Sequence, residues 1–332
     1  MLKLIKNLLI LAVLVIMVSA GAFYWRVSSP LELKSDTVDF DIARGSSMRA
    51  AAAEIAAAGV PLEPWLLVVL GKVLRVESSI KAGSYQLNRG VTALQLLKKL
   101  TRGDVSQSEI VFIEGWTFRQ MRERLDAHPD LRHDTKGLSE TEIMRLLGAP
   151  ERVAEGMFFP DTYLFAKQSR DADVLSRAYR AMQQRLAQAW ASRAPGLPLS
   201  QPYQALILAS IVEKETGREA DRPLVAAVFV NRLRQGMLLQ TDPTVIYGLG
   251  ERFDGNLHKR DLLSDTPYNT YTRAGLPPTP IAMPGLASLQ AALRPAPTQA
   301  IYFVARGDGS SEFSPTLDAH NQAVNRYQRS GR

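Results

Sequence analysis

Hydrophobic and polar positions divide the chain into one long apolar run and a much longer amphipathic region. Residues 7–25 contain no charged side chain. As a helix, residues 8–25 would extend roughly 27 Å, which is close to the thickness of the hydrocarbon core of a bilayer. The pattern therefore predicts a helix that crosses a membrane once.

Charged and small residues around this run indicate its orientation and processing. Lys3 and Lys6 precede it, and basic flanks stay on the cytoplasmic side of a membrane. We therefore expect residues 1–6 in the cytoplasm and the chain beyond the helix on the opposite side. A cleaved signal peptide is the alternative, because Val18-Ser19-Ala20 provides small residues at a cleavage site. The apolar run continues past that site, which favours an uncleaved transmembrane helix over 7–25.

After a short tether over residues 26–37, the pattern changes to short strands and amphipathic helices. Three successive units each place a strand before a glycine-containing turn with a polar cap and a helix. The strands are predicted over 38–42, 80–87 and 109–113, and the helices over 48–58, 93–100 and 118–125. Together they predict a compact α+β subdomain over residues 38–127.

The remaining chain has a longer helical pattern interrupted by proline and glycine. Residues 128–150 are polar and predict a surface connection with a short helix over 140–147. Residues 151–332 are expected to form one larger domain. Its predicted elements are helices over 172–193, 203–216 and 321–329, a strand over 301–305, and loops over 239–297. The predicted fold class is α+β, with one N-terminal transmembrane helix, a small α+β subdomain and a mixed α+β domain.

Composition narrows the chemistry more than the fold. The 332 residues contain 46% hydrophobic residues and no cysteine, which excludes disulfides, thiolate metal sites and thiol nucleophiles. The formal net charge is +7, but Lys and Arg are spread along the chain. A generic basic surface explains this balance, although nucleic acid, phospholipid head groups and an acidic cell-wall polymer are all compatible with it.

Motifs for several catalytic classes are absent. The four histidines form no HExxH or HxH pair, and no GxSxG, Walker A or GxGxxG pattern occurs. Residues 78–81 match SxxK, but the KTG and SDN motifs that accompany it in serine acyl-enzymes are missing. We therefore expect no metal and no cofactor, which leaves catalysis by carboxylates.

The apolar helix predicted over 203–216 ends with two acids, Glu213 and Glu215. A carboxyl against apolar walls has a raised pKa, so it can hold a proton and donate it to the leaving oxygen of a glycosidic bond. At helical spacing the two side chains point roughly 200° apart, so at most one faces a given cleft. Spacing alone does not choose between them. The alternative is that both are solvated residues of a helix end, one of them paired with Lys214 or Arg218.

A set of motifs resembles the endolytic murein transglycosylase family, also called YceG-like. The motifs are EGMFFPDTY (155–163), ASIVEKET (209–216), VFVNRL (228–233), LQTDPTVIYG (239–248), YNTY (268–271), GLPPTPI (275–281) and HN (320–321). In addition, residues 81–103 resemble the LysM-like carbohydrate-binding module, which would make 38–127 a LysM-like subdomain. A small structural domain without a ligand explains that weaker pattern equally well.

The resemblance implies an activity and a catalytic residue. It assigns the catalytic acid to the first glutamate of the EKET motif, Glu213, and makes residues 151–332 the catalytic domain. The family's reaction cleaves the MurNAc-GlcNAc bond of peptidoglycan, and the C6 hydroxyl of the substrate closes a 1,6-anhydro ring, so no water is consumed. One carboxylate then suffices, whereas a glycoside hydrolase requires two.

The resemblance and side-chain chemistry also imply the partners. We expect glycan strands of peptidoglycan, the inner membrane and peptidoglycan synthases as partners, no nucleic acid, and a catalytic domain in the periplasm that terminates strand elongation. Two alternatives remain: a catalytically silent wall-binding scaffold, and a hydrolase that uses Glu213 with Asp242. The expected substrate-binding residues are Glu155, Gln240, Thr241, Asp242, Tyr268, Asn269, Thr270 and Tyr271.

Overall fold

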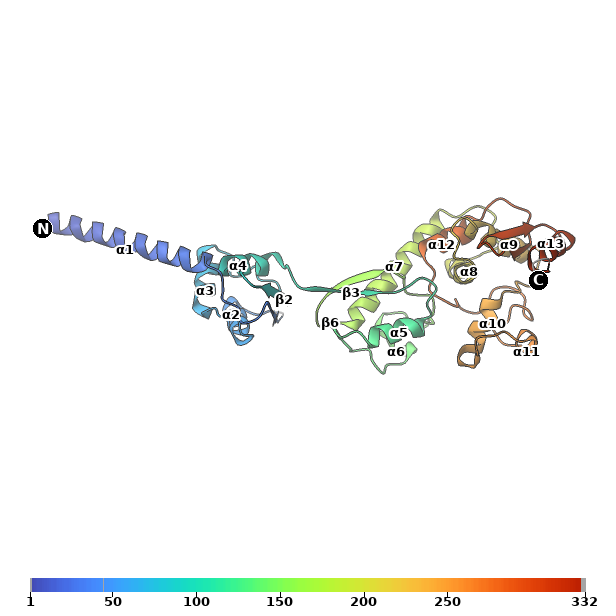
Figure 1. Ribbon diagram of the computed structural model, residues 1–332, viewed down its shortest axis with the longest axis horizontal. Coiled ribbons are helices and arrows are strands. Elements are labelled where there is room, and N and C mark those ends of the chain that lie inside the picture. Colours follow the sequence, from blue (N-terminus) through green and yellow to red (C-terminus); the bar gives the residue numbers. More distant parts are fainter. Residues whose placement is uncertain (1, 44, 330–332) are drawn as a thin grey trace. The chain divides into compact units, whose positions relative to one another are not determined.

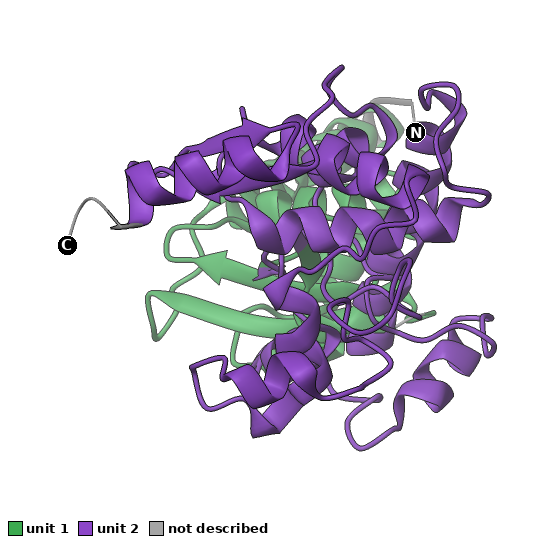
Figure 2. Ribbon diagram, turned by 90° about the vertical axis from the view of Figure 1, so that its right-hand side faces the viewer, with its two compact units in different colours: residues 1–108, 164–169 green, residues 109–163, 170–332 purple. Residues whose placement is uncertain are grey.

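The computed structural model describes residues 2–43 and 45–329 (Figure 1). Two compact units make up the chain, and Figure 2 colours them separately. Unit 1 contains residues 1–108 and 164–169, and unit 2 contains residues 109–163 and 170–332. The mixed α and β composition agrees with the predicted fold class.

Helix α1 (Leu2–Ser28) contains the predicted apolar run. Among the described residues, its segment Ile5–Ser28 is the one stretch that is long and apolar enough to cross a membrane. The side chains along most of it are exposed, as expected of a helix whose surroundings are not protein. The helix is thus consistent with membrane anchoring.

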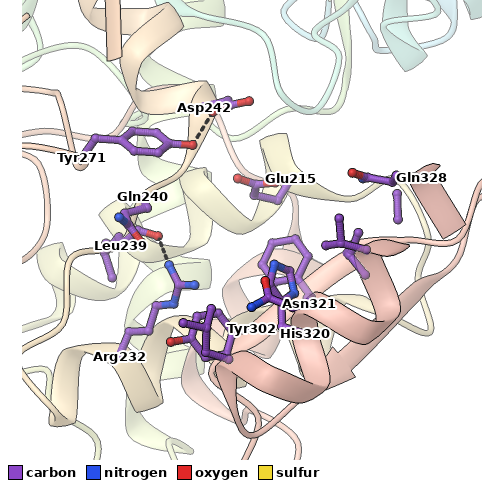
Figure 3. A pocket seen from close by; sticks show the side chains of 15 residues that line it. Glu215, Arg232, Leu239, Gln240, Asp242, Tyr271, Tyr302, His320, Asn321 and Gln328 are labelled. Atoms are coloured by element: carbon purple, nitrogen blue, oxygen red, sulfur yellow. Dashed lines mark hydrogen bonds between the residues drawn. The ribbon is translucent and has the colours of Figure 1, made fainter. Parts of the chain in front are cut away.

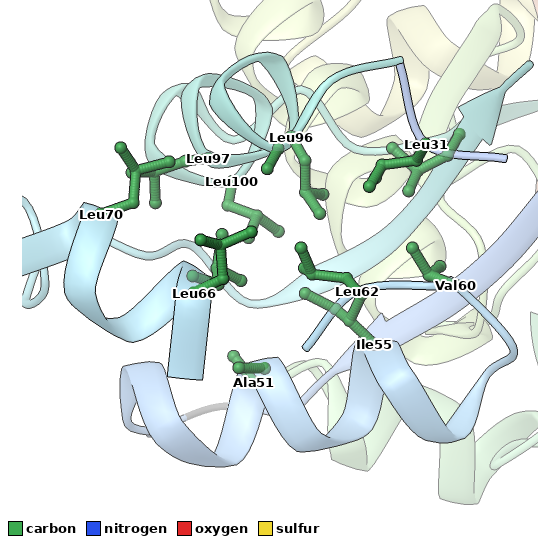
Figure 4. Packing of buried hydrophobic residues seen from close by; sticks show 14 of the residues in the cluster. Leu31, Ala51, Ile55, Val60, Leu62, Leu66, Leu70, Leu96, Leu97 and Leu100 are labelled. Carbon is green, nitrogen blue, oxygen red and sulfur yellow. The ribbon is translucent and has the colours of Figure 1, made fainter. Parts of the chain in front are cut away.

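Unit 1 is built on a two-stranded antiparallel sheet. Strand β1 (Thr37–Ile42) pairs with β2 (Gly83–Asn88), so that Phe40 lies opposite Tyr85. Between the strands come α2 (Met48–Ala57) and α3 (Pro64–Val73), and α4 (Ala93–Arg102) follows β2. Aliphatic side chains of the three helices pack together in the core shown in Figure 4.

The segment expected to be a free tether is part of this core. Val27, Leu31 and Leu33 are buried, and the Leu31 N–H donates to the carbonyl of Val91. Burial of these apolar side chains removes them from water, so the segment packs instead of remaining a spacer. The expectation of a tether over 26–37 is therefore corrected.

Helix α3 has no counterpart among the predicted elements. Its sequence, PWLLVVLGKV, is apolar almost throughout and lacks the alternation that would indicate an amphipathic helix. The third predicted strand and helix lie mainly in unit 2, so the subdomain expected over 38–127 does not coincide with one compact unit. A LysM-like character stays a prediction.

Unit 2 is mainly helical. Its sheets are short pairs, β3 with β5, β4 with β6, and β7 with β8, and parts of β3, β5 and β6 belong to unit 1. The elements are β3 (Gln107–Val111), α5 (Phe118–Asp126), β4 (Leu131–Arg132), α6 (Glu140–Leu146), β5 (Thr162–Ala166), β6 (Ser169–Arg170), α7 (Asp171–Ala191), α8 (Pro202–Glu215), α9 (Arg222–Arg234), α10 (Asp242–Leu249), the 3₁₀ helix η1 (Gly250–Arg252), α11 (Lys259–Leu263), α12 (Leu286–Leu293), β7 (Tyr302–Ala305), β8 (Ser311–Ser314), α13 (Leu317–Val324) and the π-helix η2 (Asn325–Arg329).

Helix α8 forms the centre of this unit. All eight residues from 205 to 212 are buried, and α8 packs against α7, α9 and α12. Because the helix is apolar all round, it can be covered on every side. The C-terminal end of α8 carries the two acids Glu213 and Glu215.

Candidate active site

The two glutamates at the end of α8 have different partners. The Glu213 side chain is 7% exposed and its Oε2 accepts a hydrogen bond of 2.9 Å from the Gly285 N–H. Its Oε1 lies 3.7 Å from a guanidinium nitrogen of Arg222. A further acid, Glu114, lies beside it, and burial together with the charge of Glu213 raises the pKa of Glu114. Glu213 is therefore held between a backbone donor and an arginine.

Glu215 instead lines a cavity of about 620 Å³. The Thr241 hydroxyl donates a hydrogen bond to its carboxylate. Burial raises the pKa of Glu215 and the nearby charge of Asp242 raises it further, against the lowering effect of the Thr241 hydrogen bond. Glu215 is consequently a buried carboxyl group with a raised pKa that lines the cavity.

One wall of the cavity comes from the segment before α10 and from the loop that contains Tyr271 (Figure 3). The Tyr271 hydroxyl donates to Asp242 Oδ1 at 2.5 Å, and burial, with Asp242 as the second cause, raises the pKa of that hydroxyl. Gln240 has a φ of 49°, which is a strained backbone conformation for a non-glycine residue. Gln240 is exposed at the cavity wall, whereas its neighbours Leu239 and Thr241 are buried.

The opposite wall comes from β7 and α13 (Figure 3). The rings of Tyr302 and His320 stack with their centroids 5.2 Å apart, and the Arg232 guanidinium lies over Tyr302 at 5.3 Å. Burial and the positive charge of Arg232 both lower the pKa of His320, so its imidazole is neutral near pH 7. Aromatic surface beside amide and hydroxyl groups suits a sugar, which has one apolar face and polar edges.

Three of the expected substrate-binding residues line this cavity: Gln240, Asp242 and Tyr271. Thr241 is buried behind the wall and reaches the cavity only through its bond to Glu215. Thr270 is buried too, and its hydroxyl accepts from the Thr241 N–H at 3.1 Å. The structure therefore gives Thr241 and Thr270 a supporting position.

Asn269 and Tyr268 do not line the cavity. The buried Asn269 side chain donates to the carbonyls of Leu262 and Ser264, at 3.0 and 2.7 Å, and so closes its own loop. The Tyr268 hydroxyl is 2.8 Å from the Thr279 hydroxyl. Both residues satisfy buried polar groups of neighbouring loops, which accounts for them without a ligand.

Glu155 is buried away from the cavity residues. Its two oxygens accept hydrogen bonds from the Phe118 N–H at 3.0 Å and from the Tyr247 hydroxyl at 3.1 Å. Burial raises its pKa to about 7, although both hydrogen bonds act in the opposite direction. Glu155 thus joins the start of α5 to α10, the helix that begins with Asp242.

A second polar cluster consists of Asp126, His133 and Asp171, whose potential ligand atoms lie within 4.8 Å of one another. The Asp171 oxygens already accept hydrogen bonds from the Asp134, Thr135 and Ala172 N–H groups and from the Thr135 hydroxyl. These hydrogen bonds join Asp171, the first residue of α7, to residues 134 and 135. They account for Asp171, whereas Asp126 Oδ1 and His133 Nδ1 are buried without a hydrogen-bond partner among the described residues.

Comparison with known proteins decides the family. The model of the YceG-like family matches residues 40–326, which is most of the chain. The chain belongs to the YceG-like family. This YceG-like chain is 32% identical over 331 residues to an endolytic murein transglycosylase of Bacillus subtilis, covering 94% of the chain and 91% of that protein.

Two further relatives agree with this assignment. An endolytic murein transglycosylase of Streptococcus pneumoniae is 27% identical over 285 residues, covering 74% of the YceG-like chain but 50% of its own length. The crystal structure of a YceG-like protein from Listeria monocytogenes gives a TM-score of 0.53 at 28% identity, covering 86% of this chain and 98% of the other. The family resemblance inferred from the motifs is thereby confirmed.

Several cavity residues of the YceG-like chain were not among the expected binding residues. These are Glu215, Arg232, Tyr302, His320 and Asn321. Arg232 lies in the VFVNRL motif and His320 and Asn321 form the HN motif, so the motifs contained a signal. Tyr302 carried none, because a tyrosine in a strand near the C-terminus is typical of ordinary packing.

Proposed function

We propose that this protein is an endolytic murein lytic transglycosylase that cleaves the MurNAc-GlcNAc bond of glycan strands and leaves 1,6-anhydro-MurNAc ends. The observation that carries the proposal is the carboxyl group of Glu215, which lines a polar and aromatic cavity and whose pKa is raised by burial. The names of the relatives from Bacillus subtilis and Streptococcus pneumoniae support the same reaction class.

In this mechanism one carboxyl group moves both protons. Glu215 donates its proton to the glycosidic oxygen as the bond between that oxygen and C1 of MurNAc breaks. The resulting carboxylate accepts the proton of the C6 hydroxyl, whose oxygen forms the new bond to C1. Glu215 ends the cycle protonated, and the reaction neither consumes nor releases water.

The geometry favours Glu215 over Glu213, the residue that the family resemblance implied. Both oxygens of Glu213 face protein partners, and Glu213 is not among the residues that line the cavity. A general acid needs an unobstructed path to the leaving oxygen, within about 3 Å. In this proposal Glu213 instead positions the loop at Gly285 against the end of α8.

Asp242 is proposed to bind or stabilise the substrate without acting as a nucleophile. Its Oδ1 already accepts a hydrogen bond of 2.5 Å from the Tyr271 hydroxyl, so that oxygen has a protein partner. A hydrolase that pairs Glu215 with Asp242 is the competing mechanism, because two carboxylates beside one cavity are what hydrolysis requires. The two mechanisms differ in the chemical form of the new glycan end.

A matched pair of variants tests the reaction and its acid. Full-length protein in detergent micelles is incubated with isolated glycan strands, and the products are weighed by mass spectrometry. Wild type should release anhydro ends, and Glu215→Gln, which cannot cycle a proton, should lose at least about 10²-fold in rate. Glu213→Gln should retain cleavage, because its amide can still accept the Gly285 N–H.

Each other result rejects part of the proposal. Reducing ends from wild type would establish the hydrolase, and no release of fragments would establish a wall-binding scaffold. Loss of cleavage in Glu213→Gln together with retained cleavage in Glu215→Gln would return the catalytic role to Glu213. Circular dichroism of both variants verifies that the fold is retained.

The proposed location follows from α1 and the charges before it. Helix α1 would cross the inner membrane with Lys3 and Lys6 on the cytoplasmic side, which leaves the catalytic unit in the periplasm. There it would meet new glycan strands close to their site of synthesis and terminate their elongation, with peptidoglycan synthases as neighbours. Binding of glycan by the LysM-like segment belongs to the same proposal.

A further inference from the structure

Helix α3 of unit 1 has an apolar face that none of the residues described by the structure covers. Trp65, Val69 and Val73 follow one another at intervals of four residues, so they form one stripe along the helix. Their exposed fractions are 60%, 38% and 65%. The opposite face contributes Leu66 and Leu70 to the core (Figure 4). The exposed stripe is therefore apolar surface beyond what the packing of unit 1 requires.

The stripe begins where the end of α1 meets the rest of unit 1. The Arg26 guanidinium, near the end of α1, contacts the Glu63 carboxylate at 3.1 Å, and Glu63 is the residue directly before α3. Val27 is buried in the same core as Leu66. Figure 1 shows α3 at the end of unit 1 from which α1 extends. If α1 crosses a bilayer, the start of α3 lies at the level of its surface.

The composition of α3 suits a helix lying in a membrane interface. Its ten residues extend about 15 Å, which is too short to cross the hydrocarbon core. Tryptophan is enriched at the interface, and the exposed cations Lys72 and Arg75 adjoin the stripe where phospholipid head groups would be. Lysine can extend its ammonium group toward the head groups while its aliphatic part stays in apolar surroundings.

We infer that the exposed face of α3 inserts into the head-group region of the bilayer that α1 crosses, with anionic phospholipid as its partner. This inference rests on the proposed anchoring by α1. A second contact beside the anchor restricts how unit 1 can tilt about the end of α1. The apolar stripe of α3 then serves to hold unit 1 against the membrane surface.

Single-tryptophan variants of the full-length protein test this inference in liposomes that contain phosphatidylglycerol. The chain has four tryptophans, Trp25, Trp65, Trp116 and Trp190, so replacing three with phenylalanine isolates the fourth. Quenching by brominated phospholipid reports contact with lipid, and quenching by aqueous iodide reports contact with water. The Trp25-only protein reports whether α1 is inserted.

A matched control places an exposed indole elsewhere in unit 1. The control is Arg102→Trp in a background without the native tryptophans. Arg102 is the last residue of α4. The other end of α4 begins after Thr92, which pairs with Pro30 just beyond α1. Because α4 is about 15 Å long, this position is removed from the proposed membrane contact.

We expect Trp65 to be quenched several-fold more strongly by brominated lipid, and several-fold less by iodide, than the Arg102→Trp control. The double substitution Val69→Ser and Val73→Ser in the Trp65-only protein should reduce lipid quenching, because it removes the apolar surface without touching the core.

Equal quenching of Trp65 and the control, with Trp25 still quenched by lipid, would overturn the inference. Shielding of Trp65 from both quenchers would assign the face to a protein partner and reject lipid. Absence of lipid quenching at Trp25 would reject the anchor itself, and this inference with it.

Discussion

Two glutamates two positions apart at the end of α8 illustrate how strongly the surroundings decide the chemistry of a side chain. Glu213 contacts Arg222 and Gly285, whereas Glu215 contacts Thr241 and borders the cavity. Their opposite directions follow from helical spacing, so the sequence predicts that only one faces a cleft. Which one does so depends on the partners Arg222, Gly285 and Thr241, and these are brought to α8 only by the folded chain.

Glu155 leads to a prediction about pH and stability. Its pKa is raised from 4.5 to about 7 by burial, so the folded state binds its proton more tightly than the unfolded state does. Its contribution to the free energy of unfolding is therefore fully present below pH 4.5 and is lost as the pH rises through about 7. The loss amounts to roughly 3 kcal/mol, at about 1.4 kcal/mol for each pKa unit.

Glu155→Gln should remove this dependence, because the amide does not ionise and still accepts the Phe118 N–H. Denaturant unfolding at about pH 5 and about pH 8 measures the effect as the difference between variant and wild type. The free energy of unfolding of Glu155→Gln, relative to that of wild type, should increase as the pH rises. Glu219→Gln, at an exposed position, provides the control and should change little at either pH. A difference that does not change with pH would contradict the assigned pKa.

At the scale of elements, the placement of α8 depends on a buried hydroxyl as well as on apolar packing. The fully buried Ser210 accepts a hydrogen bond of 3.0 Å from the Ile281 N–H and donates one of 2.7 Å to the Ile207 carbonyl. This hydroxyl therefore joins α8 to the loop that leads to Gly285. In an otherwise apolar helix, Ser210 fixes which loop lies against it.

Ser210→Ala should lower the free energy of unfolding by about 1–3 kcal/mol, because it leaves the Ile281 N–H buried without an acceptor. Ser200→Ala offers a matched control, since Ser200 is exposed and lies just before α8. Its hydroxyl donates a hydrogen bond to the Gln204 side chain in the first turn of the helix. That control should cost less than about 1 kcal/mol. Thermal or chemical unfolding monitored by circular dichroism compares the two. Equal losses would mean that the contact with Ile281 does not stabilise α8.

Helix α3 is one of the elements that sequence periodicity missed. The others include α10, α11 and α12, which lie in the segment 239–297 that was expected to form only loops. For α3 the reason is physical. Periodicity detects a helix that has one apolar and one polar face. In α3 both faces are apolar: one face packs into the core, and the other is exposed. Such a helix shows no alternation between apolar and polar positions. The same property that concealed this helix is the one that points to a membrane as its partner.

On the scale of the whole chain, the connection between α1 and unit 1 is a packed joint. Val27, Leu31 and Leu33 leave water when unit 1 folds. Each fully buried aliphatic side chain contributes about 1.5–3 kcal/mol. Helix α1 is therefore continuous with the packed core of unit 1.

Two truncations test this joint. A chain that begins at Arg26 keeps all three buried residues, so it should remain folded and soluble. A chain that begins at Ser35 loses them, so unit 1 should unfold at a lower denaturant concentration and become more sensitive to proteases. Limited proteolysis and denaturant unfolding of both chains measure the difference. Equal stability of the two chains would show that residues 26–34 act as a tether after all.

Much of this organisation was readable before any tertiary contact was known. The apolar run of α1, the limits of α7 and α8, and strands β1 and β7 follow from local pattern, since helix and strand periods are properties of neighbouring residues. The motifs indicated the family for the same reason, because they are contiguous stretches of the chain. The absence of cysteine excluded thiol chemistry without any structure.

Other features depended on contacts between residues far apart in the chain. The cavity gathers Glu215, Asp242, Tyr271, Tyr302 and His320 from five separate segments. Burial of Glu155 requires Phe118 and Tyr247, which are distant from it in sequence. Burial and charge determine a pKa, and both are set by which segments pack together. For that reason the position of Glu215 at the cavity, the supporting positions of Thr241 and Thr270, and the exposed face of α3 emerged only from the folded chain.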